Sequence, residues 1–152
     1  ANVFARPEGD LAIGEATLRG VAVETIAGPG GGPPLFVATM PVTFETMQES
    51  LFALVRCDCE PDGFFLLTGG MGKAPPEEGG FWRLNGHMHE LRDEAGAARM
   101  HRVELSGECP PEALDRVLGA MGWPDAELVF ELVQEGLTLP EKDFRRWAAA
   151  EA

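Results

Sequence analysis

The sequence predicts an α+β fold: a two-layer sandwich in which helices cover one face of a mainly antiparallel sheet. Residues 35–68 and residues 100–133 each have the pattern of a strand, a helix and a strand. Two such β-α-β units suggest a ferredoxin-like arrangement, to which extra N-terminal strands are added. The 152 residues, 45% of them hydrophobic, can build one core, so we expect a single domain over residues 1–152.

The first forty residues predict strands and a loop. Between Leu11 and Ala27, β-branched and small apolar residues mix with single polar ones, which favours one or two strands with a bulge or bend at Gly14 and Gly20. The stretch GPGGGPP, residues 28–34, predicts a loop, because glycine relaxes the backbone and proline lacks a donor. Residues 35–40, LFVATM, predict a further strand.

A helix is expected from Thr43 onward, in PVTFETMQESLFALVRC. Thr43 is a good N-cap, and Phe44, Met47 and Leu51 recur at helical spacing on one face. A turn at residues 60–63, a short buried strand at residues 64–68 and a glycine-rich loop at residues 69–80 follow.

The last third predicts two more helices around a strand. PPEALDRVLGAMGWP forms the first, with Pro110 or Pro111 in its opening turn, and residues 126–133 form the strand. Thr138 and Glu141 have the spacing of a capping box at the start of the C-terminal helix. Trp147 lies on this short helix, which needs a docking surface, either the chain's own sheet or a partner.

All three histidines fall within LNGHMHELRDEAGAARMHRVEL, residues 84–105. DEAGA suits a three-residue hairpin loop with Gly96 in the left-handed conformation. In that register His89 faces His101, and His87 lies two residues before His89 on the same side. Three imidazoles on one face could supply three nitrogen ligands to zinc, with water as the fourth ligand, or could hold a proton near neutral pH.

The alternative is three structural histidines on an ordinary hairpin. A register slip of one residue moves His101 to the other face. No H-E-x-x-H motif and no cysteine pair at zinc-finger spacing supports the metal site. In the predicted register, Glu90 and Glu104 fall on the opposite face from the histidines.

The formal net charge of −13 excludes one class of partner. Phosphate backbones bind through lysine and arginine, so a negative field repels nucleic acid and anionic membranes. No apolar run reaches the roughly 20 residues needed to span a bilayer, and ANVFARPEGD does not resemble a signal peptide. We therefore expect a cytoplasmic protein without nucleic-acid or membrane partners.

Few residues qualify for catalysis. Cys57, Cys59 and Cys109 are an odd number of cysteines, which argues against a disulfide framework, and C-x-C is not a thioredoxin-like motif. The first two are expected to be small buried thiols near a helix end. Ser50, Ser106 and Cys109 are the candidate nucleophiles, but no G-x-S-x-G motif is present. TGGMGKAPP, residues 68–76, lacks the spacing of a phosphate-binding loop.

Packing signals without a catalytic set favour a non-enzymatic binding or assembly protein that self-associates through a sheet edge or an apolar helix face. From Thr43 onward, the order of helix, three strands, helix, strand and helix is similar to that of secretion chaperones, which share the size and acidity but no sequence motif. No cofactor is expected under this hypothesis. The alternatives are an enzyme that uses zinc or histidine chemistry at His87, His89 and His101, and a small-ligand binder that uses the two glycine-rich loops.

Overall fold

The computed structural model describes residues 1–150. Within that range it contains three α-helices and nine strands, and the strand pairs described here are antiparallel, so the predicted α+β class is confirmed. The chain divides into two compact units. Unit 1 consists of residues 1–38 with the chain from Glu127 onward, and unit 2 is Thr39–Ala126. The expectation of a single domain over residues 1–152 stays a prediction.

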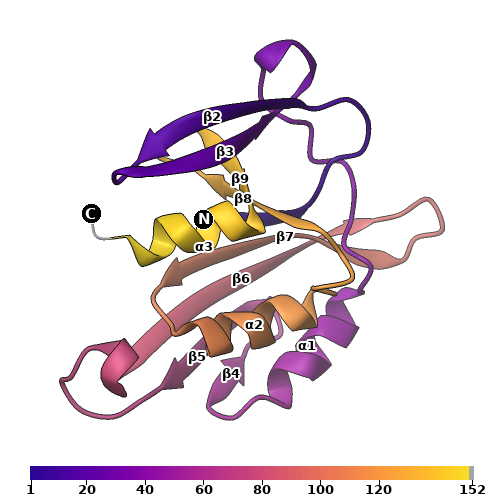
Figure 1. The fold of residues 1–152 in the computed structure, drawn as a ribbon. Helices are drawn as coiled ribbons and strands as arrows, with labels where there is room; N and C mark the ends of the chain where they lie inside the picture. The colour runs from indigo at the N-terminus through magenta and orange to yellow at the C-terminus, as the bar shows by residue number, and fades with distance from the viewer. Residues whose placement is uncertain (151–152) are drawn as a thin grey trace. The chain divides into compact units, whose positions relative to one another are not determined.

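Unit 2 is a four-stranded antiparallel sheet with two helices (Figure 1). Each strand pairs with the next in chain order, and α1 packs against α2 and against strands of the sheet. The strands are β4 (Cys57–Cys59), β5 (Phe64–Gly69), β6 (Trp82–Arg92) and β7 (Ala98–Gly107), and the helices are α1 (Phe44–Phe52) and α2 (Pro111–Ala120).

The burial pattern of β6 defines two faces of this sheet. Leu84, Gly86 and Met88 are buried, whereas the alternate residues Arg83 and Asn85 are exposed. Because successive side chains of a strand point to opposite faces, the first set lies on the core side and the second on the outer side. Helix α1 packs against β4, β6 and β7, so unit 2 consists of an antiparallel sheet with helices packed on it. The outer face of β6 carries polar residues such as Arg83 and Asn85.

Helix α1 starts as predicted and ends early. The Thr43 side chain accepts a hydrogen bond from the backbone N–H of Thr46, which confirms the N-cap. Met47 and Leu51 are buried on its apolar face. The helix ends at Phe52, and residues 57–59 form a strand of the sheet. Cys57 and Cys59, expected as small buried thiols near a helix end, are part-buried residues of this strand, which begins five residues after α1 ends.

The strand predicted for residues 35–40 is wrong. Leu35 and Val37 are each 78% exposed, so this apolar run is not buried in a sheet. Only its last residue takes part in pairing: the Met40 N–H donates to the Met100 carbonyl, and the Met100 N–H donates to the Val42 carbonyl. The first of the two expected β-α-β units therefore lacks its opening strand, and a ferredoxin-like topology is not shown.

Unit 1 combines a three-stranded antiparallel sheet, a two-stranded hairpin and one helix. The sheet has the order β1, β8, β9, and α3 contacts β3, β8 and β9. Its elements are β1 (Asn2–Ala5), β8 (Leu128–Leu132), β9 (Leu137–Pro140), the hairpin strands β2 (Ala12–Leu18) and β3 (Val21–Ala27), and α3 (Glu141–Ala149); short 3-10 turns cover Pro29–Gly31 here and Pro76–Glu78 in unit 2.

Of the one or two strands predicted between Leu11 and Ala27, two are present, and they pair as a hairpin that bends at Gly20, where φ is +72°. Gly14 pairs with Thr25 in a regular register, so no bulge lies there. The capping box is wrong. Thr138 is a buried residue of β9, and the residue that precedes α3 is Pro140, without a side-chain cap. The strands β1 and β9, which lie at the sides of β8, were not predicted from their short sequences.

Helix α3 docks within its own unit. The Arg19 guanidinium lies 4.1 Å from the centre of the Trp147 ring, and Phe144 stacks on Phe130 with ring centres 4.0 Å apart. Trp147 thus has an intrachain partner on the β2–β3 hairpin. None of the helices in residues 1–150 has both the length and the apolar composition required to cross a membrane.

Candidate functional site

The turn of the β6–β7 hairpin has the predicted geometry. Gly96 has φ +82°, in the left-handed region, and its N–H donates to the Asp93 carbonyl. The Asp93 carboxylate accepts a hydrogen bond from the Ala97 N–H at 2.8 Å. Arg92 pairs with Ala98 and Glu90 with Met100, as the three-residue loop predicts.

Beyond these pairs the register shifts by one residue. His89 faces Arg102 and His87 faces Glu104, because the register shifts between His89 and Glu90: β7 has one extra residue, His101, between Met100 and Arg102, which forms a β-bulge. The prediction that His89 faces His101 is therefore wrong. Glu104, which the uninterrupted register puts on the far face, is instead directly opposite His87.

The bulge has a packing cause. Met100 and Val103 are both fully buried, with two residues between them. In a regular strand such residues point to opposite faces. The extra residue lets both side chains reach the core and leaves Arg102 and Glu104 on the outer face with His87 and His89.

Three ligand-bearing side chains gather on this outer face. The ligand atoms of His87, His89 and Glu104 all lie within 4.8 Å of one another. His89 Nε2 is 3.1 Å from Glu104 Oε1. The His87 ring stacks on Phe64 of β5, with ring centres 3.7 Å apart, and lies 4.2 Å from the His89 ring. Phe64, opposite His87 on β5, thus forms one wall of the cluster.

The cluster is partly exposed and contains one competing cation. The side chains of His89 and Glu104 are 30% and 47% exposed, and Arg102 lies 3.2 Å from the same oxygen, Glu104 Oε1. Burial, followed by the charges of Arg102 and His87, lowers the pKa of His89 below its usual value of 6.5, against the opposing effect of Glu104. A lowered pKa keeps His89 neutral at pH 7, the form that binds a metal.

The donors match a transition metal better than magnesium or calcium. Two imidazoles and one carboxylate suit zinc, with a fourth position open to water, whereas the hard ions prefer oxygen ligands. With metal–ligand bonds of about 2.0–2.1 Å, tetrahedral ligand atoms are about 3.4 Å apart. The distance of 3.1 Å between His89 Nε2 and Glu104 Oε1 is close to this value. Rotation of the partly exposed side chains would bring a ring nitrogen of His87 to a similar distance from both.

The structure thus brings together two of the three predicted metal ligands. His87 and His89 belong to the cluster, and His101 does not. Glu104 was missed because its placement depends on the bulge. The sequence signal that could have indicated the bulge is the spacing of two apolar residues, Met100 and Val103. Residues three positions apart in a regular strand point to opposite faces, so both cannot reach the core without an extra residue.

The three candidate nucleophiles lie in different segments of unit 2. The Ser50 hydroxyl donates to the Thr46 carbonyl within α1. Ser106 is an exposed strand residue opposite Asn85, and Cys109, which forms no disulfide, lies between β7 and α2. In the second glycine-rich loop, the N–H groups of Met71 and Phe81 donate to carbonyls of the same loop. Those groups are already satisfied and do not point to a phosphate cradle.

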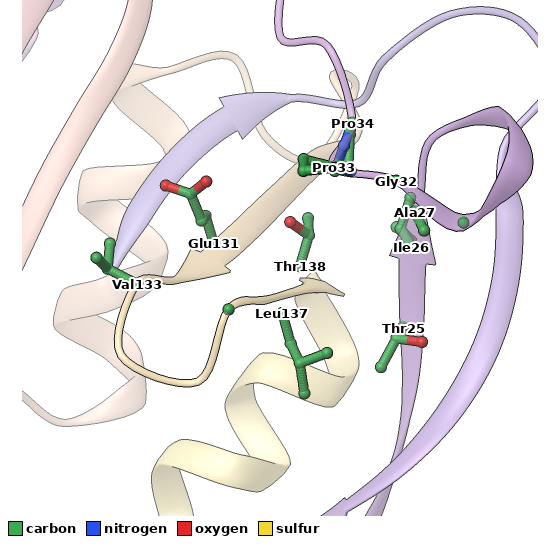
Figure 2. A pocket seen from close by; sticks show the side chains of 12 residues that line it. Thr25, Ile26, Ala27, Gly32, Pro33, Pro34, Glu131, Val133, Leu137 and Thr138 are labelled. Carbon is green, nitrogen blue, oxygen red and sulfur yellow. The ribbon is translucent and has the colours of Figure 1, made fainter.

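A cleft in unit 1 involves the first glycine-rich loop (Figure 2). It has a volume of about 370 Å³ and is lined by the end of β3, by residues 31–34 and by the β8–β9 hairpin. Its polar groups include Thr25, Thr138 and Glu131, whose carboxylate accepts a hydrogen bond from the Asn2 side chain at 2.9 Å. The small-ligand hypothesis therefore has a concave surface at one of the two loops.

No protein-family model, no curated protein and no solved structure matches this chain.

Proposed function

We propose that this protein binds a divalent transition-metal ion, zinc by the chemistry of its donors, on His87, His89 and Glu104. The observation that carries the proposal is the cross-strand cluster, in which all three ligand atoms lie within 4.8 Å of one another. The site combines the metal hypothesis of the sequence with a different third ligand, glutamate in place of His101.

The role we propose is binding and not hydrolysis. A zinc-bound water becomes a strong nucleophile where the protein encloses it in a dry, shaped cavity. Here the ligands lie on the outer face of a sheet, with the Glu104 side chain 47% exposed and the neighbouring Phe64 48% exposed. Such a surface suits metal-dependent attachment or metal storage better than catalysis. It fits the non-enzymatic class that the sequence favours, and the cytoplasmic location stays a prediction.

The test is a calorimetric titration of the untagged full-length protein with zinc chloride near neutral pH. One zinc ion per chain is expected for the wild type and for His101→Ala, the matched control on the same hairpin. His87→Ala and His89→Ala should each lose this uptake. Equal zinc uptake by the wild type and His89→Ala would overturn the proposal. A parallel titration in a Cys57→Ser/Cys59→Ser background removes any zinc bound by thiols.

Self-association through the edge of the unit 2 sheet is a second candidate function. Among the described strands β4 pairs only with β5, and the apolar side chains of Phe52 and Val55, just before β4, are 58% and 75% exposed. An open strand edge beside apolar side chains favours pairing with a second copy. Sedimentation velocity tests it: we expect a concentration-dependent dimer that Val55→Glu disrupts, and a wild type that stays monomeric at high concentration contradicts it.

A further inference from the structure

A second pair of metal-ligating side chains lies on the edge strand of unit 2. Cys57 and Cys59 are two residues apart on β4, so their side chains point to the same face. Their sulfur atoms are 3.9 Å apart, and both thiols are free. Asp58, between them, is exposed. The two thiols therefore form one site, and the carboxylate between them belongs to the other face.

That site lies on the core side of the sheet. Cys57 faces Leu67 and Cys59 faces Phe65 on β5, and these two partners are 1% and 4% exposed. Directly opposite residues share a face. His87 faces the exposed Phe64, which belongs to the outer side. The thiol pair and the histidine cluster are thus on opposite faces, and neither shares a ligand with the other.

The spacing fits a bridging ion better than a disulfide. Cα atoms of residues two apart on an extended strand are about 6.6 Å apart, near the upper limit of about 6.8 Å for a disulfide. A disulfide would also need the sulfurs to approach from 3.9 Å to about 2.05 Å. With metal–sulfur bonds of about 2.3 Å, sulfurs 3.9 Å apart subtend an angle of about 116° at the ion. That angle is between tetrahedral and trigonal geometry.

The number of donors decides the kind of ion. Among the described residues, no third histidine, cysteine or carboxylate joins the two thiols in a cluster. Zinc in structural sites takes four protein ligands, whereas copper(I), a soft d¹⁰ ion, is stable with two or three thiolate ligands. We propose that Cys57 and Cys59 bind copper(I) as a pair of thiolates, with a third position open to an external thiol.

Binding exchanges protons for metal without a redox step. Burial, the neighbouring Cys59 and then Asp58 raise the pKa of Cys57 to about 12, and burial also raises that of Cys59. Both thiols are therefore protonated at neutral pH and are weak nucleophiles. When copper(I) binds, two S–H bonds break, two Cu–S bonds form and two protons leave to solvent, while copper and sulfur keep their oxidation states.

The test is an anaerobic titration of the reduced, untagged full-length protein with copper(I), in competition with a chromophoric copper(I) chelator. One copper(I) per chain is expected. Cys57→Ser and Cys59→Ser should each weaken binding by about 100-fold or more, because the second thiolate binds intramolecularly. Cys109→Ser is the matched thiol control, and His87→Ala/His89→Ala is the control for the other face. Both should keep the wild-type affinity.

Two results would overturn this proposal. One is a wild-type affinity in Cys57→Ser or Cys59→Ser that far-ultraviolet circular dichroism shows to be folded. The other does not depend on any variant: X-ray absorption at the copper edge of the loaded wild type should show two sulfur neighbours, and a shell of nitrogen alone contradicts the site. Neither result bears on zinc binding by the histidine cluster.

Discussion

The strand register at the two ends of the β6–β7 hairpin is set by different interactions. At the turn end, Gly96 in the left-handed conformation and the pair Arg92–Ala98 match the register that the loop sequence predicts. At the far end, His87 faces Glu104, one position away from that register. The loop determines which residues pair between the turn and the bulge, and packing of the core determines which residues pair beyond the bulge. A site at the far end is therefore decided by packing and not by turn chemistry.

The largest expected effect is at the far end. Glu104→Gln and His89→Ala should each weaken zinc binding by more than about 100-fold, since even the loss of outer-shell partners typically costs 10–100-fold. Competition with a chromophoric zinc chelator measures this loss. Glu90→Gln, on the same hairpin but outside the cluster, is the control. If Glu104→Gln keeps the wild-type affinity, the carboxylate is not a ligand and the bulge has no role in the site.

At the turn end, Gly96→Ala should lower the free energy of unfolding by about 1–2 kcal/mol, the cost of the left-handed conformation for a residue with a Cβ. A Cβ added there meets nothing within 4 Å, so the cost is in the backbone alone. Urea denaturation measures it.

Gly119→Ala in α2 is the matched control for this variant, because its added Cβ also meets nothing within 4 Å and its backbone is helical. It should raise stability by about 0.5–1 kcal/mol. If both variants change stability by the same amount in the same direction, the turn is not strained by a Cβ and its predicted geometry is wrong.

A smaller effect is expected from removing Arg102, whose guanidinium competes with a metal ion for the Glu104 carboxylate. Arg102 lies 3.2 Å from Glu104 Oε1 and helps to lower the pKa of His89. Removing it frees the carboxylate, so Arg102→Gln should tighten zinc binding by up to about fivefold, the equivalent of an exposed ion pair of about 1 kcal/mol. Arg99→Gln, whose partner is Asp93 at the turn end, should leave the affinity unchanged. Weaker zinc binding by Arg102→Gln would contradict this account of the site.

The smallest effect concerns acid stability at the turn. The hydrogen bond from the Ala97 N–H, with help from Arg99, lowers the pKa of Asp93 below its usual 3.8. A carboxyl with a lowered folded-state pKa stabilises the fold above its unfolded-state pKa, and this stabilisation is lost as the pH falls through the folded-state value. The stability difference between wild type and Asp93→Asn should therefore be full at neutral pH and shrink below pH 3.8.

Denaturation at several pH values measures that difference. Glu94→Gln, an exposed neighbour in the same turn, is the control. A difference that stays constant from neutral pH down to strong acid would show that the Asp93 carboxylate does not hold the turn.

Local signals predicted individual elements well. The Thr43 cap, the start of α2 at Pro111 and the bend at Gly20 each depend on a few adjacent residues, and each is present. The failures are elements whose partner is distant in sequence. β1 pairs with β8 more than a hundred residues later, and Thr138 is part of β9 and not a cap, because its backbone pairs with Glu131.

The sequence by itself determined the α+β class, the starts of α1 and α2, and the presence of His87 and His89 on one hairpin beside a glycine turn. Each of these follows from contacts between residues a few positions apart. Only the tertiary structure decided which side chain completes the site. Burying both Met100 and Val103 requires an extra residue in β7, and that residue moves His101 out of the cluster and brings Glu104 into it.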